Sequence, residues 1–193
     1  MNKRIKIALL MIPAVMLMTA GLAQAQDEHA FVGTKNCKKC HIKEWKSWQD
    51  TTMAKAYDTL KPGERVEAKT KHGLDPQKDY TKDATCLECH TTGYGSEGGF
   101  TSMDETPELA NVSCEACHGP GGTYTEDQYM SLKNKEYKRS EVVAVGLVHP
   151  INKEVCTACH NANNPTNPDE DFDFENRKHE GVHEIYPLKY DHD

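Results

Sequence analysis

Hydrophobic residues are concentrated at the N-terminus of the chain and are more widely spaced afterwards. Residues 1–4 carry positive charge from Lys3 and Arg4. An apolar run over residues 7–18 follows, and small residues continue as far as Ala25. This order predicts a secretory signal peptide over residues 1–25, cleaved after Ala25. The apolar run is shorter than the roughly 20 residues that a membrane-spanning helix needs, and no later stretch approaches that length. We therefore expect an exported chain without a transmembrane span.

Beyond Ala25, the clearest periodic segment follows the first cysteine pair. Ile42, Trp45, Met53 and Leu60 belong to a series with three- and four-residue steps, which ends at a Lys-Pro-Gly sequence. This spacing predicts a helix over residues 42–60. Glycine-rich stretches at 93–99 and 119–122 predict loops, and residues 161–173 predict a linker. We expect residues 174–190 to pack back on the body.

Composition and charge narrow the class of protein. Hydrophobic residues make up 37% of the 193 residues, and the formal net charge is −7. Loss of Lys3, Arg4 and Lys6 with the signal peptide lowers that charge to −10, which disfavours nucleic-acid binding and favours a basic redox partner. Residues 26–193 suffice for a single domain, but they are too poor in apolar side chains to fold by packing alone. Large apolar cofactors would supply the missing core.

All eight cysteines fall into four copies of one pattern, Cys-x-x-Cys-His, at unequal intervals. This is the attachment signature of c-type haem, in which two thiols form thioethers and the adjacent imidazole binds the iron. We therefore predict four covalently attached haem c groups. The alternative, two zinc sites of four cysteines each, requires no histidine after each pair. The copies are Cys37-Lys38-Lys39-Cys40-His41, Cys86-Leu87-Glu88-Cys89-His90, Cys114-Glu115-Ala116-Cys117-His118 and Cys156-Thr157-Ala158-Cys159-His160.

The chain has ten histidines, four of which follow the cysteine pairs and are the predicted proximal ligands. A second imidazole on each iron would make the haems six-coordinate and suited to electron exchange. His192 ranks last among the candidates because it lies one residue from the chain end. Met53 is an alternative ligand, although packing on a helix explains it as well. The distal candidates, in order of preference, are His149, His179 and His183, then His72, then His29.

One further pattern overlaps these histidines. Residues 179–183 read His-Glu-x-x-His, the zinc-protease helix motif. Gly181 weakens a helix at the centre of this motif, and no third ligand is obvious in the residues that remain. We therefore favour haem ligation over a protease site.

Longer stretches of the chain resemble the cytochrome c554 family. The resemblance runs from about residue 33 to residue 160 and includes segments between the cysteine motifs. It implies a mainly α fold with long loops, a small multihaem c-type cytochrome whose polypeptide wraps round closely packed haems. Met53 and Gln128 stand where the family pattern has distal histidines. The matching segments are Trp48-Gln49-Asp50-Thr51-Thr52-Met53-Ala54-Lys55-Ala56, Leu74-Asp75-Pro76-Gln77-Lys78-Asp79-Tyr80, Gly93-Tyr94-Gly95, Gly98-Gly99-Phe100 and Cys114-Glu115-Ala116-Cys117-His118-Gly119-Pro120-Gly121.

Two functions remain open at this point. The first is a non-enzymatic electron carrier of the periplasm or the extracellular surface, acting as a shuttle or as a subunit of a conduit. Histidines in excess of one monomer's need favour a homo-oligomer or filament that shares haem ligands. The alternative is a multihaem reductase of a small nitrogen compound, with one iron open to substrate. A metal-binding structural protein is a third and weaker hypothesis, which a red product would exclude.

Overall fold

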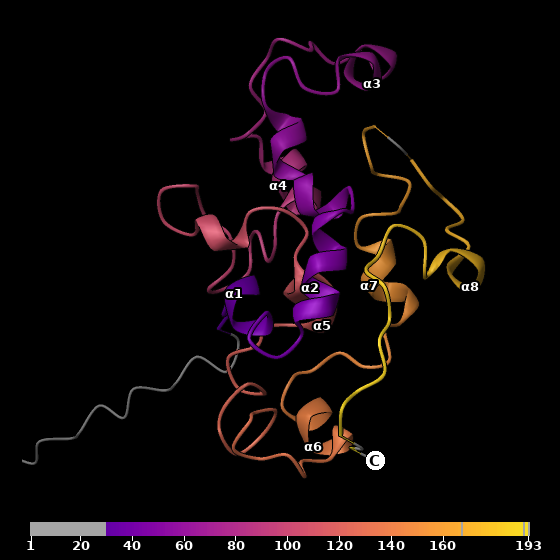
Figure 1. The fold of residues 1–193 in the computed structure, drawn as a ribbon. Coiled ribbons are helices and arrows are strands. Elements are labelled where there is room, and N and C mark those ends of the chain that lie inside the picture. Colours follow the sequence, from indigo (N-terminus) through magenta and orange to yellow (C-terminus); the bar gives the residue numbers. More distant parts are fainter. Residues whose placement is uncertain (1–29, 167, 191, 193) are drawn as a thin grey trace, which may run out of the picture.

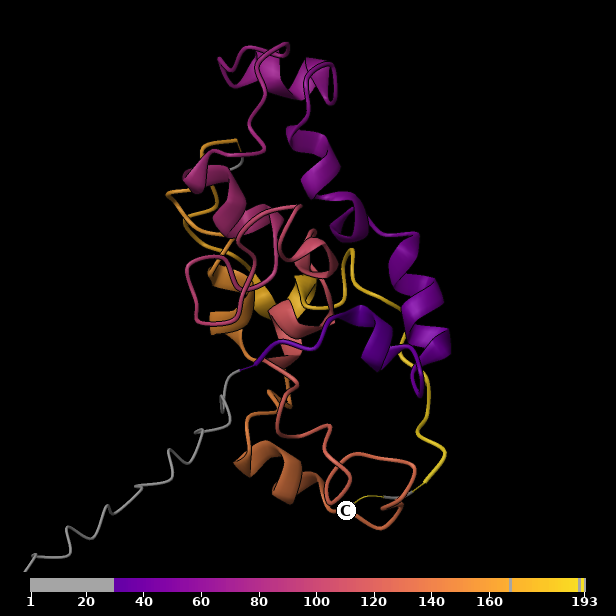
Figure 2. The same ribbon diagram turned by 90° about the vertical axis from the view of Figure 1, so that its left-hand side faces the viewer.

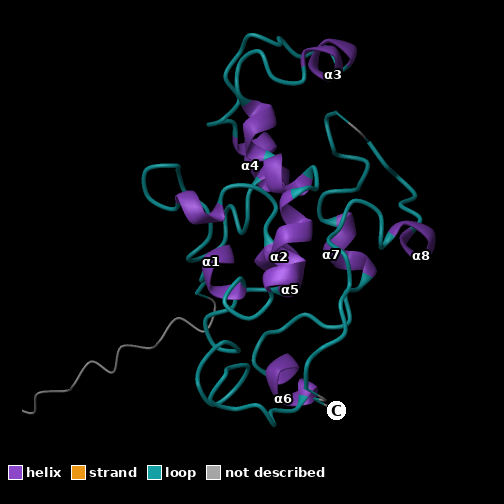
Figure 3. Ribbon diagram, viewed as in Figure 1, coloured by secondary structure: helices purple, strands orange, loops and turns teal. Residues whose placement is uncertain are grey.

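The computed structural model describes residues 30–166, 168–190 and 192. The predicted signal peptide, residues 1–25, and His29 lie outside the described residues. Helices are short, and the described residues contain no strand, only an isolated bridge between Thr91 and Ala110 (Figure 3). The mainly α fold with long loops is therefore confirmed. The elements are α1 (Thr34–Cys37), α2 (Ile42–Gln49), η1 (Met53–Lys55), η2 (Tyr57–Leu60), α3 (Val66–Lys71), α4 (Ala84–His90), η3 (Pro107–Leu109), α5 (Cys114–His118), α6 (Arg139–Ala144), α7 (Lys153–Thr157) and α8 (Phe174–Arg177).

The short helices gather in the middle of an elongated molecule. Both ribbon views place α3 at one end and α6 at the other, with α1, α5 and α7 between them (Figures 1 and 2). The C-terminal segment leaves α8 and runs back along the molecule toward α6, as expected for residues 174–190. The Glu184 amide donates to the Ser47 hydroxyl at 2.8 Å, which ties this segment to α2. None of the helices in the described part of the chain has the length and apolarity needed to cross a membrane.

The helix predicted over residues 42–60 is interrupted. It begins at Ile42 and ends at Gln49, and two 3-10 turns replace its second half. The Thr51 hydroxyl donates to the Trp48 carbonyl at 2.7 Å, a local bond that competes with the helical pattern. Further on, the Tyr57 amide donates to the Asn111 side chain at 2.9 Å instead of to a helical carbonyl. The periodicity therefore predicts the helix correctly over the first half of residues 42–60 and wrongly over the second half.

Buried apolar side chains form two small clusters. One contains Tyr57, Leu60, Tyr80, Leu87, Phe100 and Leu109, and the other contains Tyr124, Tyr137 and Val142. Aromatic residues make up half of the first cluster and two of the three residues in the second, and they bury more surface per residue than aliphatic side chains do. Such small clusters leave much of the folding free energy to be supplied by other contacts, in agreement with the low apolar content of the sequence.

Two loops meet at the buried carboxylate of Glu115, which is 2% exposed. It accepts hydrogen bonds from the amides of Val32 at 2.9 Å, Gly33 at 2.7 Å and Gly121 at 2.7 Å. Backbone amides that would otherwise be unpaired in the interior are satisfied by one side chain. Glu115 thus joins the segment before α1 and the Gly-Pro-Gly loop to α5.

We expect Trp48→Phe to lower the free energy of unfolding by about 1 kcal/mol, the net value of one hydrogen bond. The indole nitrogen of Trp48 donates to the Val112 carbonyl at 3.0 Å, and phenylalanine cannot replace that bond. The control is Trp45→Phe, because Lys38 lies 3.8 Å above the Trp45 ring and a phenyl face also attracts a cation. Denaturant unfolding followed by circular dichroism measures both. Equal midpoints for the two variants would contradict the prediction.

Candidate haem sites

Each cysteine motif lies on a short helix or on the turn that follows one. The second and third motifs lie within α4 and α5, whereas the first and fourth begin at the ends of α1 and α7. Helical turns continue through the latter two, since the His41 and His160 amides each bond the carbonyl of the first cysteine at 2.9 Å. Two residues three apart on a helix share a face. The paired thiols and the following imidazole are therefore brought together locally at every motif.

The four motifs also contact one another in a definite order. Helix α5 contacts both α1 and α7. The Cys37 side chain interacts with Cys114, and Cys159 interacts with Cys89. The first motif therefore contacts the third, the third contacts the fourth and the fourth contacts the second. The second motif also lies beside the third, since the Thr92 hydroxyl donates to the Ser113 hydroxyl at 2.8 Å. Burial raises the pKa of the Cys117 thiol to about 11, an environment that disfavours a free thiolate and suits a neutral thioether.

The imidazole of His90 is fixed by its backbone environment. Its Nδ1 atom lies 2.7 Å from the Ala56 carbonyl and 3.1 Å from the Thr59 hydroxyl. Burial lowers the pKa of His90, so the neutral form is favoured. A carbonyl oxygen only accepts, so Nδ1 carries the proton and Nε2 keeps its lone pair. Metal-binding histidines have this arrangement, in which one ring nitrogen donates to a carbonyl and the other binds the metal.

His118 lies among several other histidines. Burial is the main cause that lowers its pKa, and the ring also bonds the Val148 backbone. The nearby His183, His149 and His41 lower that pKa further. The ring centres of His118 and His183 are 6.3 Å apart. Because a bond between a metal and a histidine nitrogen is about 2 Å long, this gap has room for one iron between the two rings.

The imidazole of His160 contains a polar atom without a protein partner. Its Nδ1 atom is buried and makes no hydrogen bond. The ring stacks on Phe172 at 4.9 Å, and the Arg177 guanidinium lies 4.6 Å above that phenyl ring. Burial lowers the pKa of His160. A buried nitrogen without a partner costs free energy, so contacts of the ring face, and not a hydrogen bond, hold the His160 imidazole.

The predicted distal histidines have different environments. His183 is half-buried beside His118, and its Nδ1 lies 2.8 Å from the Glu184 carbonyl. His149 is near His118 but exposed, and His179 is exposed on the turn after α8. His72 follows α3 at one end of the molecule, away from α1, α5 and α7 (Figure 1). The structure thus brings His183 and His149 near the motif imidazole of His118.

Two sequence alternatives lack the local structure that they need. Residues 178–182 form turns and a bend after α8 ends at Arg177, and Gly181 has a φ of +70°. The His-Glu-x-x-His pattern therefore does not form the helix of a zinc protease. In the described residues, no three cysteine, histidine or acidic side chains converge on a point where one metal ion could bind.

Sequence reasoning undervalued His192. This residue is 7% exposed, although it lies near the chain end, and its ring stacks on Tyr137 with centres 3.9 Å apart. It lines a cavity together with Cys40 and His41. The ranking by distance from the chain end was wrong about its burial. The burial of His192 results from its contact with Tyr137, which lies 55 residues earlier in the chain. No pattern in the local sequence indicates that contact.

Comparisons with known proteins identify the family. The model of the family described as cytochrome c554 and c-prime matches residues 36–119. The solved structure of reduced cytochrome c554 from Nitrosomonas europaea superposes with a TM-score of 0.69 at 32% identity, over 84% of this chain and 88% of that one. This chain belongs to the cytochrome c554 family. As a member of that family it is a c-type cytochrome with four covalently attached haem groups.

The curated cytochrome c-554 of Nitrosomonas europaea is 40% identical over 152 residues, which cover 76% of this chain. The chain matches 64% of the length of that relative. The cytochrome c554 family accounts for the helical, strand-poor architecture of the chain. The described residues also fit the cofactor, since the gap between the His118 and His183 rings has room for one bound iron.

Proposed function

We propose that this cytochrome is an exported electron-transfer protein, in which each Cys-x-x-Cys-His motif attaches one haem. The cysteines form the thioether bonds, and the adjacent imidazoles are the proximal iron ligands. When bound, the haems supply reversible one-electron chemistry. The attachment residues are Cys37, Cys40, Cys86, Cys89, Cys114, Cys117, Cys156 and Cys159, and the proximal ligands are His41, His90, His118 and His160.

The observation that carries this proposal is the continuous order of contacts among the motifs. The first motif contacts the third, the third contacts the fourth, and the fourth contacts the second. The polypeptide therefore holds each of its four attachment points next to at least one other. Backbone hydrogen bonds fix the imidazoles of His90 and His118, so little rearrangement is needed at these two positions between oxidation states. That rigidity favours a conductor of electrons over a site that must open for substrate.

The distal ligand of the third motif follows from the same geometry. His183 lies across a 6.3 Å gap from His118, and its Nδ1 contacts the Glu184 carbonyl, which leaves Nε2 for the iron. We therefore assign His183 as the partner of His118. His149 is the second candidate in that neighbourhood. The other irons also need distal ligands, which this subunit or a neighbouring one could provide. The remaining candidates are His72, His179 and His29.

Export and assembly are part of the proposal. The N-terminal pattern supports export to the periplasm or the cell surface, and a formal charge of −7 supports a basic redox partner. The exposed His149 and His179 support assembly into a conduit in which subunits exchange ligands. Sedimentation of the haem-loaded protein over a range of concentration checks the last point. Monomers at every concentration would favour a diffusing shuttle instead.

The experiment that tests electron transfer combines two measurements on the haem-loaded protein. Low-temperature EPR counts high-spin and low-spin irons, and stopped-flow absorbance follows reduction and reoxidation by a small electron donor and acceptor. We expect all four haems to be reduced and reoxidised reversibly, without consumption of hydroxylamine or nitrogen oxides. Sustained turnover of such a compound faster than free haem would replace this proposal with the reductase.

A further inference from the structure

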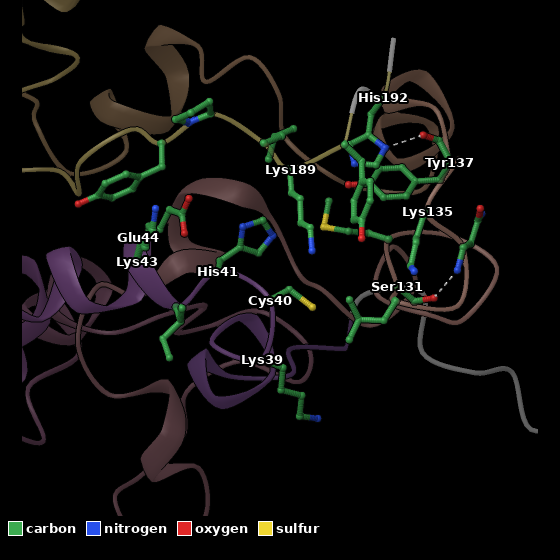
Figure 4. Close-up of a pocket in the computed structure, with 18 residues that line it drawn as sticks. Lys39, Cys40, His41, Lys43, Glu44, Ser131, Lys135, Tyr137, Lys189 and His192 are labelled. Carbon is green, nitrogen blue, oxygen red and sulfur yellow. Dashed lines mark hydrogen bonds between the residues drawn. The ribbon is translucent and has the colours of Figure 1, made fainter.

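A cavity of about 500 Å³ opens beside the first motif (Figure 4). Its walls come from three parts of the chain: residues 39–44, a loop within residues 130–137, and the C-terminal residues 186–190 and 192. Cofactor pockets have volumes of roughly 300–1,000 Å³, so this cavity is of the right size for one. The third wall exists because the C-terminal segment runs back to the loop before α6.

The lining suits a flat apolar ring that carries carboxylates. Met130, Leu132 and Leu188 contribute apolar surface. Lys39 and Lys135 place positive charge on the same cavity in a chain whose net charge is negative. A haem has this combination, an apolar porphyrin with two propionate groups. The first motif supplies Cys40 and His41 to the cavity, the residues expected beside an attached haem.

His192 belongs to the wall formed by the C-terminal segment. Figure 4 shows its ring beside Tyr137, whereas His41 and Cys40 lie on the side that belongs to the first motif. The ring is held firmly, since it stacks on Tyr137 with an interplanar angle of 13°. The backbone is also anchored, because the His192 carbonyl accepts from the Arg139 amide at 2.7 Å.

The hydrogen bond of the ring determines which nitrogen is available. Nδ1 of His192 lies 3.0 Å from the Tyr137 carbonyl. A carbonyl only accepts, so Nδ1 is protonated and Nε2 keeps a lone pair. In iron-binding and zinc-binding histidines, one ring nitrogen binds the metal, and the N–H of the other commonly donates to a backbone carbonyl. Among the described residues that line the cavity, His41 and His192 are the two imidazoles.

We propose that His192 is the sixth ligand of the iron whose proximal ligand is His41. This assignment rests on the proposed attachment of a haem at Cys37 and Cys40. The C-terminal segment then acts as a strap that closes the first haem to outside ligands. Met130 and Lys189 line the same cavity and are the competing donors.

The test uses His192→Ala in the haem-loaded protein, with Ile185→Ala as the matched control because Ile185 is exposed on the same C-terminal segment, does not line the cavity and has no donor atom. We expect EPR to show one more high-spin iron per chain than in the parent protein, and added imidazole to return that iron to the low-spin state. His192→Gln should give the same change, since its amide can still bond the Tyr137 carbonyl while offering a poor iron ligand. The control should keep the spin count of the parent.

Two outcomes separate the ligand assignment from the attachment itself. Peptide mass spectrometry reports whether Cys37 and Cys40 carry a haem. An attached haem together with an unchanged spin count in both His192 variants would overturn the assignment and point to Met130 or Lys189. Unmodified cysteines at these two positions would overturn the attachment and, with it, the assignment.

Discussion

Cys114→Ala combined with Cys117→Ala should divide the electron path of this cytochrome in two. The variant loses the haem of the third motif, which lies between the first motif and the fourth, because α5 contacts both α1 and α7. We expect electron equilibration between the first motif and the fourth to slow by at least tenfold, about 1.4 kcal/mol in barrier. Stopped-flow reduction followed by multi-wavelength absorbance measures it.

The control for this prediction is the double variant Cys86→Ala with Cys89→Ala. It also removes one haem, but from the second motif, which is not needed to connect the first motif with the fourth through α5. Equilibration among the other three motifs should persist there. Should the third-motif variant fail to accumulate, His118→Met retains both thioethers and raises the reduction potential at the centre of the path. If electrons equilibrate between the first and fourth motifs at the same rate in both double variants, the contacts through the third motif do not govern electron transfer.

Glu115→Ala should strongly destabilise the fold. It leaves the amides of Val32, Gly33 and Gly121 without their acceptor in a buried site. Bonds to a charged acceptor are worth more than neutral ones, and the loss of three should cost on the order of 4 kcal/mol. Glu115→Gln has one acceptor oxygen in place of two and should cost about 2 kcal/mol.

Glu88 provides a matched control for this substitution. It occupies a variable position of the second motif, but its side chain is exposed. Glu88→Ala should therefore change the free energy of unfolding by less than about 0.5 kcal/mol. Denaturant unfolding of the haem-loaded proteins, followed by circular dichroism, compares the three variants with the parent. A Glu115→Ala midpoint as high as that of Glu88→Ala would refute the role of this carboxylate in joining the two loops.

The first half of the helix after the first motif, the glycine-rich loops and the return of residues 174–190 could all be predicted from the sequence. These features depend on neighbouring residues, on steps of three and four and on backbone freedom. The break after Gln49 could not be predicted, because the Trp48 indole and the Tyr57 amide bond residues 111 and 112. Partners more than fifty residues away leave no periodic signal.

The same division applies to the haem sites. By itself the sequence determined the four Cys-x-x-Cys-His units, because attachment chemistry needs only residues within one helical turn. It also determined that the chain is acidic and poor in apolar side chains. Tertiary structure alone decided which motifs are neighbours, the proximity of His183 to His118, and the burial of Glu115 and His192. Each of these features depends on which segments distant in the sequence lie next to one another. In a chain of short helices, loops and long-range hydrogen bonds determine that arrangement.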